Sequence, residues 1–257
     1  MSRNLLTGLV GAWCPSLGPS GYTLLDRSGR GQHGTLTNMD AGSDWVGGPG
    51  GWTLDFDGSN DYVSLPSISV ANELTISTWF YARSVSSGML FNKQTTNTAF
   101  NVPIFSGQLY LRGGDITPVV SAAISANTLY HAVATIKGTA GTIYLNGTQA
   151  ATGSVTAIAN TTGVCEIGRY GDYGGGYYFN GWLSDLGLWS RALTAPEAAE
   201  LYRQRQGGLG RLLTQRAQRR VYRTQAAVKS YLFLNRGDRK STRLNSSHIP
   251  LSRMPSS

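Results

Sequence analysis

The stretch LTISTWFYAR, residues 74–83, decides the class of fold. Leu, Ile, Thr and Phe at positions 74, 76, 78 and 80 alternate with Thr, Ser, Trp and Tyr at the positions between them. Successive side chains of a β-strand point to opposite faces, so this period of two predicts a strand with two distinct faces. The stretch YHAVATIK, residues 130–137, alternates in the same way.

Outward from these two stretches, about a dozen short strand candidates follow one another between residues 9 and 191, separated by Gly, Asn and Asp turns. Asn146-Gly147 suits the positive φ angles of a type I′ hairpin turn. No helix is expected between the strands, which predicts an all-β fold: an antiparallel jelly-roll sandwich of two sheets. One short helix closes the domain, with Thr194 as N-cap and Glu197 completing a capping box.

The composition is that of a turn-rich β protein with enough apolar residues to bury a sizeable core, in one large domain or two small ones. The chain has 257 residues, of which 33 are Gly, and no run of about 18 apolar residues predicts a transmembrane helix. The first residues, MSRNLLTGLVGAWC, have too short an apolar run for a signal peptide and are interpreted as a first strand. Without a secretory context, Cys14 and Cys165 are predicted to be small buried residues, not a disulfide.

The formal charge of +8 is unevenly distributed. Residues 1–189 hold eight Lys or Arg against eleven Asp or Glu, whereas residues 190–237 hold ten against two. The sequence therefore predicts a mildly acidic β body followed by a basic extension.

The final stretch DRKSTRLNSSHIPLSRMPSS, residues 238–257, has no apolar periodicity. It resembles the conceptual translation of a short-read sequencing adapter, with two constant arms around a short insert. We expect it to be an adapter-derived artefact without structure, which would leave the natural C-terminus beyond Gly237 unknown, and we exclude it from fold reasoning.

Five blocks of the chain resemble laminin-G-like domains of the concanavalin A-like lectin/glucanase superfamily. They are LLDRSGRGQHGTLTN (24–38), LDFDGSNDYVSLP (54–66), LTISTWFYAR, YHAVATIKGTAGTIYLNGTQ (130–149) and FNGWLSDLGLWSRALTAPEAAELY (179–202). The resemblance implies a concanavalin A-like jelly roll, often with a structural calcium and often binding carbohydrate. We expect this domain over residues 1–206, a basic and partly helical or disordered extension over 207–237, and folding of residues 1–206 without the rest.

Calcium takes six to eight oxygen ligands from carboxylates, amides and carbonyls. In relatives of this fold a cation can tie an N-terminal segment and a turn to an aspartate on a late strand. The resemblance therefore implies Asp185 as the late-strand ligand and Asp26 as the N-terminal candidate. Asp57 or Asp61 is a candidate for an additional ligand. The alternatives are an Asx-turn at Asp26 and a bulge at Asp185. At Asp57, which runs into Gly58-Ser59-Asn60, a turn between two strands is favoured over a metal or a catalytic pair.

Catalysis is not expected. Some glucanases of the superfamily carry alternate carboxylates on one strand, as nucleophile and acid. The four glutamates of this chain lie apart, two of them in the closing helix, and none has a partner carboxylate two residues away. His33 and His131 have no Ser or Cys partner in the sequence pattern of a nucleophilic triad.

A sugar-binding surface is predicted in GRYGDYGGGYYFNGW, residues 168–182, because aromatic rings stack on the C–H faces of sugars and polar groups bind the hydroxyls. The candidates are Arg169, Tyr170, Asp172, Tyr173 and Tyr177. The alternative is that this segment is only the next strand, with Tyr170 in the core.

In the basic extension, Arg216, Arg219, Arg220 and Arg223 follow helical spacing. This stripe fits self-assembly or an acidic partner, or else a solvated tail; nucleic acid is not favoured, since no aromatic residues interleave it, and no membrane partner is expected. A laminin-G-like domain with such an arginine-rich tail resembles surface or tail proteins in virus-like environmental sequences. The sequence thus predicts a carbohydrate-binding or adhesion module, with a virus or phage surface or tail protein as one source. A structural assembly protein is the alternative function. The location is left open, with a virion as one option.

Overall fold

The computed structural model describes residues 5–69, 72–93, 99–114, 119–158, 163–171, 177–219 and 224–225. The chain divides into two compact units, Met1–Leu213 and Thr214–Ser257. Of the second unit only residues 214–219, which are helical, and 224–225 are described. Arg220 and Arg223 of the predicted basic stripe lie outside the described residues.

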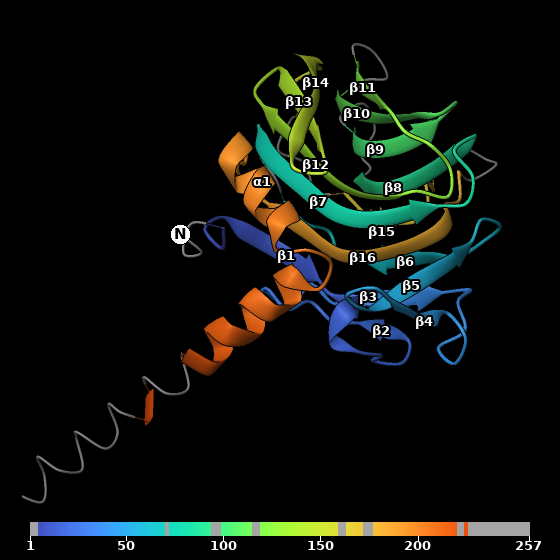
Figure 1. The fold of residues 1–257 in the computed structure, drawn as a ribbon, viewed down its shortest axis with the longest axis vertical. Coiled ribbons are helices and arrows are strands. Elements are labelled where there is room, and N and C mark those ends of the chain that lie inside the picture. The colour runs from blue at the N-terminus through green and yellow to red at the C-terminus, as the bar shows by residue number, and fades with distance from the viewer. Residues whose placement is uncertain are drawn as a thin grey trace, which may run out of the picture. The chain divides into compact units, whose positions relative to one another are not determined.

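The first unit is a sandwich of two antiparallel eight-stranded sheets (Figure 1), which confirms the predicted all-β jelly roll. Sheet A has the order β14-β13-β12-β7-β16-β5-β4, with β1 paired to β16. Its strands are β14 (Thr148–Ser154), β13 (Ala140–Leu145), β12 (Leu129–Lys137), β7 (Glu73–Ala82), β16 (Asn180–Trp189), β5 (Gly51–Asp57), β4 (Trp45–Gly48) and β1 (Leu9–Trp13).

Sheet B has the order β11-β10-β9-β8-β15-β6-β3-β2. Its strands are β11 (Val119–Ala123), β10 (Gln108–Gly114), β9 (Ala99–Phe105), β8 (Ser87–Lys93), β15 (Cys165–Ile167), β6 (Tyr62–Leu65), β3 (Gly34–Thr37) and β2 (Thr23–Leu24). Two short helices, η1 (Pro15–Leu17) and α1 (Ala195–Arg203), complete the named elements.

The main core lies between the sheets. Ile76 and Phe80 of β7 lie on one face of the strand, as the alternation in residues 74–83 predicts, and belong to this core together with Phe91 and Phe100 of sheet B. Cys165 is buried in this core and Cys14 outside it, and both are free thiols, as predicted.

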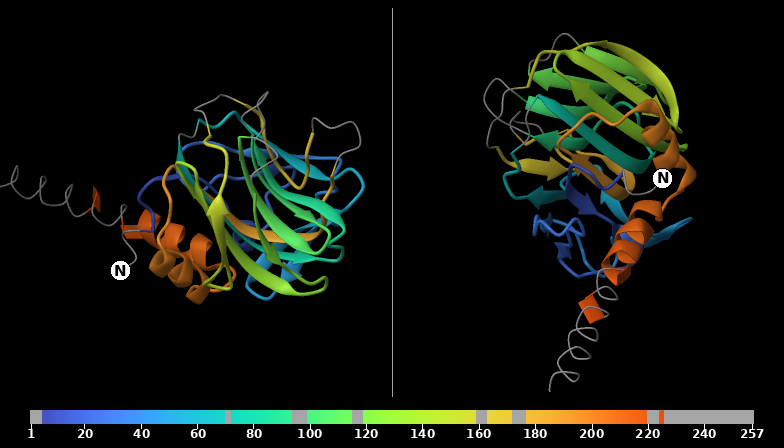
Figure 2. Two further views of the ribbon diagram at one scale, coloured as in Figure 1. Left: turned by 90° about the horizontal axis from the view of Figure 1, so that it is seen from above. Right: turned by 90° about the vertical axis from the view of Figure 1, so that its left-hand side faces the viewer.

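A second core covers part of the outer face of sheet A, the face turned away from sheet B (Figure 2). Val133 and Trp189 of the sheet pack there against Leu201 of α1 and against Leu209 and Leu213. Residues 208–219 form a further helix, so the compact unit runs to Leu213, beyond the boundary expected after residue 206. Helix α1 begins with the predicted capping box of Thr194 and Glu197.

Candidate functional site

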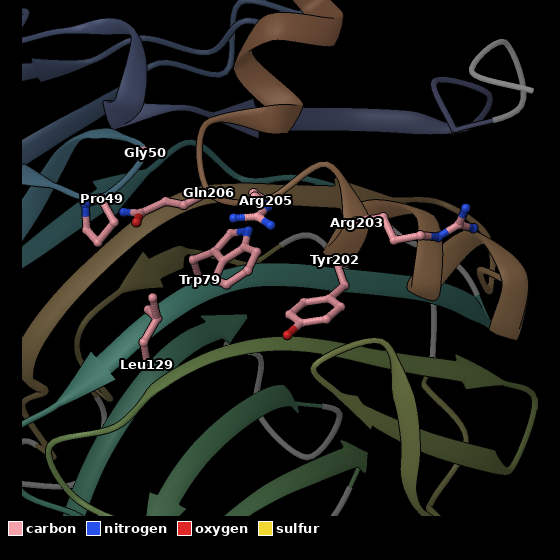
Figure 3. Close-up of a pocket in the computed structure, with 8 residues that line it drawn as sticks. All are labelled: Pro49, Gly50, Trp79, Leu129, Tyr202, Arg203, Arg205 and Gln206. Atoms are coloured by element: carbon pink, nitrogen blue, oxygen red, sulfur yellow. The ribbon is translucent and has the colours of Figure 1, made fainter.

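A pocket of about 470 Å³ opens on the outer face of sheet A, beside the second core (Figure 3). Segments distant in the sequence form it: the turn between β4 and β5, two neighbouring strands, the end of α1 and the chain that follows α1. Its lining residues are Pro49, Gly50, Trp79, Leu129, Tyr202, Arg203, Arg205 and Gln206.

The pocket has an aromatic floor and wall. Trp79 of β7 points outward because its neighbours Thr78 and Phe80 point to the core side of the strand, and the Tyr202 ring stacks beside it with 5.7 Å between centroids. His131 of β12 lies opposite Trp79 in register, 4.9 Å between ring centroids. Figure 3 shows Trp79 between Tyr202 on one side and Pro49 and Gln206 on the other.

His131 supports this floor as a neutral ring. Burial lowers its pKa to about 3, because the charged imidazolium is poorly solvated there. Its Nε2 lies 3.0 Å from Oγ of Ser77. The imidazole therefore stays uncharged at neutral pH and holds Trp79 in place by contact.

Two further aromatic side chains continue the line along the same face. Tyr81 follows Trp79 by two residues on β7, and its ring stacks on that of Trp182 with 5.1 Å between centroids and 7° between planes. Tyr81 donates a hydrogen bond to Asn127 at 3.2 Å. We call the side chains of Tyr202, Trp79, Tyr81 and Trp182 the aromatic track. Polar groups lie beside these four rings.

The polar side of the pocket comes from the chain after α1. Gln206 is 4% exposed, and within the described ranges neither polar atom of its side chain has a hydrogen-bond partner. Arg203 pairs with Glu200 at 3.0 Å and points away from Trp79 (Figure 3), whereas Arg205 is an exposed lining residue of the pocket.

Glycine allows this segment to reach the sheet. A Cβ at Gly50 would lie 2.2 Å from the carbonyl oxygen of Gln206, so any larger residue would push the two segments apart. The turn Pro49-Gly50 and the chain at Gln206-Gly207 therefore meet backbone to backbone and close one side of the pocket.

The sequence-predicted sugar residues lie elsewhere and are only partly described. Asp172 and Tyr173 are outside the described residues. Arg169 is engaged: its Nε donates to Glu166 at 3.1 Å, and its guanidinium lies 3.6 Å from the centroid of the Tyr62 ring. Tyr170 and Tyr177 come within 6.3 Å of each other, and Tyr177 is 43% exposed, so these two rings form a small aromatic surface.

A row of polar side chains crosses the outer face of sheet B near Arg169. Glu166 of β15 lies opposite Asn92 of β8, Asn92 opposite Asn101 of β9, and Asn101 opposite Arg112 of β10. The Glu166 carboxylate accepts hydrogen bonds from Arg169 and from the backbone N–H of Gly171. Glu166 is the only carboxylate among these four positions, so the row holds no pair of acids.

The carboxylate of Asp26, the N-terminal calcium candidate, accepts hydrogen bonds from groups of the protein itself. Its Oδ1 accepts from the backbone N–H groups of Ala12 and Ser28, and its Oδ2 accepts from the Ser28 hydroxyl and the Gln32 N–H, at 2.8–3.0 Å. These bonds make the Asx-turn that the alternative interpretation predicted, and they join β1 to the loop after β2.

Asp57 lies in the turn between β5 and β6. Its Oδ1 accepts from the N–H groups of Ser59 and Asn60, and these bonds lower the pKa of its carboxyl although desolvation opposes them. Asp61 faces the same turn, with Oδ2 accepting from the Asp57 N–H at 3.0 Å, and burial raises its pKa to about 6. The stretch LDFDGSNDYVSLP is therefore a strand–turn–strand unit whose acids hold the turn.

Asp185, the late-strand calcium candidate, sits in an irregularity of β16 with a φ angle of +49°. It is 3% exposed, and burial raises its pKa, opposed by the Ser16 hydroxyl and by the N–H groups of Gly210 and Gly207. Its carboxylate thus faces the start of the helix at 208–219.

The three aspartates predicted as calcium ligands do not form one common group in the described part of the chain. Within the described residues no three His, Cys, Asp or Glu side chains gather into a group that could hold a metal. Calcium needs six to eight oxygens around one point, and the oxygens described above mostly accept hydrogen bonds from the protein. Calcium binding stays a prediction.

Sequence reasoning did not identify the pocket. The alternation of residues 74–83 places Trp79 and Tyr81 on one face, and that signal could have suggested an aromatic surface. Tyr202, Arg205 and Gln206 reach the same place only because α1 folds back on sheet A, which no spacing in the sequence indicates.

Across the described ranges, no helix combines the length and the apolar character that crossing a membrane requires.

Several solved structures share the fold. Domain 4 of AbnA, a GH43 extracellular arabinanase from Geobacillus stearothermophilus solved with arabinotriose, has a TM-score of 0.61 at 18% identity, covering 76% of this chain and 98% of that one. The binding domain of Paraclostridial Mosquitocidal Protein 1 also gives 0.61 at 18% identity, over 77% of this chain and 52% of that one. A botulinum neurotoxin type C structure, whose cell entry is described as dependent on two ganglioside molecules, gives 0.58 at 16% identity, over 79% and 53%.

This chain therefore spans about half the length of the toxin structures. No protein of curated function matches the sequence. A laminin-G-type family model, described as the concanavalin A-like lectin/glucanases superfamily, matches residues 57–199. That match covers more than half of the chain and includes the strands that carry Trp79, Tyr81 and Trp182. The chain belongs to the concanavalin A-like lectin/glucanases superfamily.

Proposed function

We propose that this protein is a non-catalytic carbohydrate-binding module and that the ligand lies in the pocket and along the aromatic track. The observation that carries the proposal is the pocket itself: Trp79 forms its floor, Tyr202 its wall, and Tyr81 and Trp182 extend the aromatic surface beyond it.

The chemistry of this surface suits a sugar. Aromatic faces bind the C–H faces of sugar rings, while a few polar groups bind the hydroxyls. The volume of about 470 Å³ lies within the range of roughly 300–1,000 Å³ typical of ligand pockets. Two exposed residues supply polar groups for the hydroxyls: Asn127, whose Oδ1 accepts a hydrogen bond from Tyr81, and Arg205 in the pocket lining.

The similar structures support the ligand class without identifying the sugar. One was solved with arabinotriose, and another is described through its interaction with gangliosides. At identities of 18% and 16% they share the fold with this chain, and their ligands suggest that carbohydrates are the class to test.

The absence of catalysis is part of the proposal. Glycosidases place two carboxyl groups about 5–5.5 Å or about 6.5–9.5 Å apart. None of the pocket residues in the described part of the chain is Asp or Glu, and Glu166 on sheet B is bound by Arg169.

Arg169, Tyr170, Asp172, Tyr173 and Tyr177 remain a second proposed location for the sugar. The contact between the rings of Tyr170 and the exposed Tyr177 is the observation that favours it. A structural assembly protein, for instance of a virus or phage, is the alternative function, with the basic extension as its contact to an acidic partner or to another copy.

The test is a glycan array with the full chain and three variants. We expect Tyr202→Ala to weaken binding about tenfold, which corresponds to the roughly 1.4 kcal/mol of one lost aromatic contact. Tyr177→Ala tests the second location, and Tyr22→Ala, which alters a residue 61% exposed outside the pocket, is the control.

Loss of binding in Tyr177→Ala with full binding in Tyr202→Ala would move the site to the second location. A blank array together with ordered oligomers in size-exclusion chromatography would favour the assembly protein instead.

A further inference from the structure

Arg205 has a backbone conformation that is unusual for its residue type. Its φ angle is +60°, in the left-handed region, where most residues with a Cβ are strained. Its N–H donates to the carbonyl of Tyr202, and its carbonyl accepts from Gly208, both at 2.9 Å, so the turn after α1 fixes this angle. Glycine is the usual residue at such a position, and the chain carries glycine two and three residues later but arginine here.

The charge of Arg205 is not neutralised nearby. No ion pair or side-chain hydrogen bond of Arg205 occurs among the described residues, whereas Arg203 pairs with Glu200 and Arg191 with Glu197. The pocket residues described contain two arginines and no acid. Arg205 and Trp79 both line the pocket, and Figure 3 shows the Arg203 side chain directed away from Trp79.

Arg205 is exposed, so water solvates its guanidinium until a ligand replaces that water. Gln206, the next residue, is buried, and both polar atoms of its side chain lack a hydrogen-bond partner among the described residues, which costs free energy unless a ligand or water supplies one. An exposed guanidinium without an ion pair and a buried amide without a partner in the described part of the chain thus line the same aromatic pocket.

Resting on the proposed function, we infer that this pocket selects a sugar that carries a carboxylate. The sugar ring packs on Trp79 and Tyr202, and its carboxylate accepts hydrogen bonds from the Arg205 guanidinium, whose planar fork matches a carboxylate. Arg205 is then the residue that determines specificity. Its strained backbone conformation places the guanidinium so that it binds this anion.

The experiment compares acidic sugars with neutral counterparts by isothermal titration calorimetry on the full chain. The pairs are trigalacturonate with its methyl ester, and sialyllactose with lactose. We expect at least one acid to bind at least tenfold more tightly than its neutral counterpart, and this preference to shrink as salt is raised.

The informative variants are Arg205→Gly and Arg205→Asn, because both residues tolerate a positive φ angle. We expect them to abolish the preference for the acid while the melting temperature stays unchanged or rises. Arg216→Ala, which removes an exposed arginine outside the pocket, should keep the preference and serves as the control for net charge.

Equal binding of acid and neutral sugar by the unaltered chain would overturn the inference, as would an undiminished preference in Arg205→Gly. Binding of neutral sugars alone, on the array or here, would overturn it while leaving the proposed function standing. No binding to any sugar in either experiment would overturn both.

Discussion

The outer faces of the two sheets carry different kinds of side chains. On sheet A, Leu201, Leu209 and Leu213 cover part of the face with a second core, and the aromatic pocket lies where this cover ends. On sheet B, polar side chains from successive strands lie opposite one another, from Glu166 to Arg112.

The difference shows which segments of the chain form the pocket. Sheet B builds its polar row from its own strands, so register alone places those residues. Sheet A supplies Trp79 and Leu129, but Tyr202, Arg205 and Gln206 come from the chain that packs on it. The site on sheet A therefore depends on the segment after residue 203, and loss of that segment should affect stability and binding together.

The largest effect is expected from shortening the chain. Deleting residues 207–257 removes Leu209 and Leu213, which are 5% and 6% exposed, whereas deleting 214–257 leaves both in place. Burying one leucine contributes about 1.5–3 kcal/mol to the free energy of unfolding. We therefore expect deletion of 207–257 to lower that free energy by several kcal/mol and deletion of 214–257 to change it little. Equal melting temperatures of the two would show that residues 1–206 fold alone, as the sequence predicts.

His131, under the pocket, should make stability depend on acid. Its pKa falls from 6.5 in the unfolded chain to about 3 in the fold, so stability is full above about pH 6.5 and declines as the pH falls toward 3. The decline is at most about 1.4 kcal/mol per pH unit. Urea unfolding of His131→Phe should lack this part of the slope; an unchanged slope would mean that His131 is charged in the fold.

Asp61 should produce a smaller effect of opposite sign. Its pKa is raised to about 6, so the fold binds a proton that the unfolded chain releases near pH 4. Stability is therefore highest below about pH 4 and falls as the pH rises through about 6. Asp61→Asn should remove this fall.

Asp57→Asn is the matched control, four residues earlier in the same turn. The pKa of Asp57 is lowered, so its contribution is present above the ordinary carboxyl pKa and is lost in acid. The two variants should change opposite ends of the pH profile, and an identical effect of both would contradict the hydrogen bonds assigned to this turn.

The smallest effect is expected at Asp185. Burial raises the pKa of its carboxyl, so the charged form costs stability above the ordinary carboxyl pKa, and Asp185→Asn should leave the melting temperature at neutral pH unchanged or slightly higher. Chelator should have little effect, because Ser16 and the N–H groups of Gly207 and Gly210 face the carboxylate.

A calcium-dependent rise of several degrees that Asp185→Asn abolishes would instead support the metal site. Calcium at 100 times its dissociation constant would raise the free energy of unfolding by about 2.7 kcal/mol.

The fold could be predicted because its signals are local or repeated. The alternation in residues 74–83, the Asn146-Gly147 turn and the Thr194–Glu197 capping box each act within a few residues, and the structure has all three. The end of the domain was less predictable, since Leu209 and Leu213 show their role only when they meet Val133 and Trp189.

The site could be predicted only in part for the same reason. A cluster of tyrosines at 170–178 is visible in the sequence, and two of its rings do come together. The pocket joins Gly50, Trp79, Leu129 and Tyr202, which are separated by long stretches of chain, so only the folded arrangement shows that they are neighbours.

The most direct test of carbohydrate binding at this pocket uses the six tryptophans as reporters. The chain, labelled with ¹⁵N, is titrated with the oligosaccharide that binds best on the array, and the indole N–H signals are followed by NMR. We predict that the signals of Trp79 and Trp182 shift, while those of Trp13 and Trp189, whose indole N–H groups donate to Gln32 and Leu5 in the interior, stay in place. Saturation with sugar that leaves Trp79 and Trp182 unmoved would contradict the account.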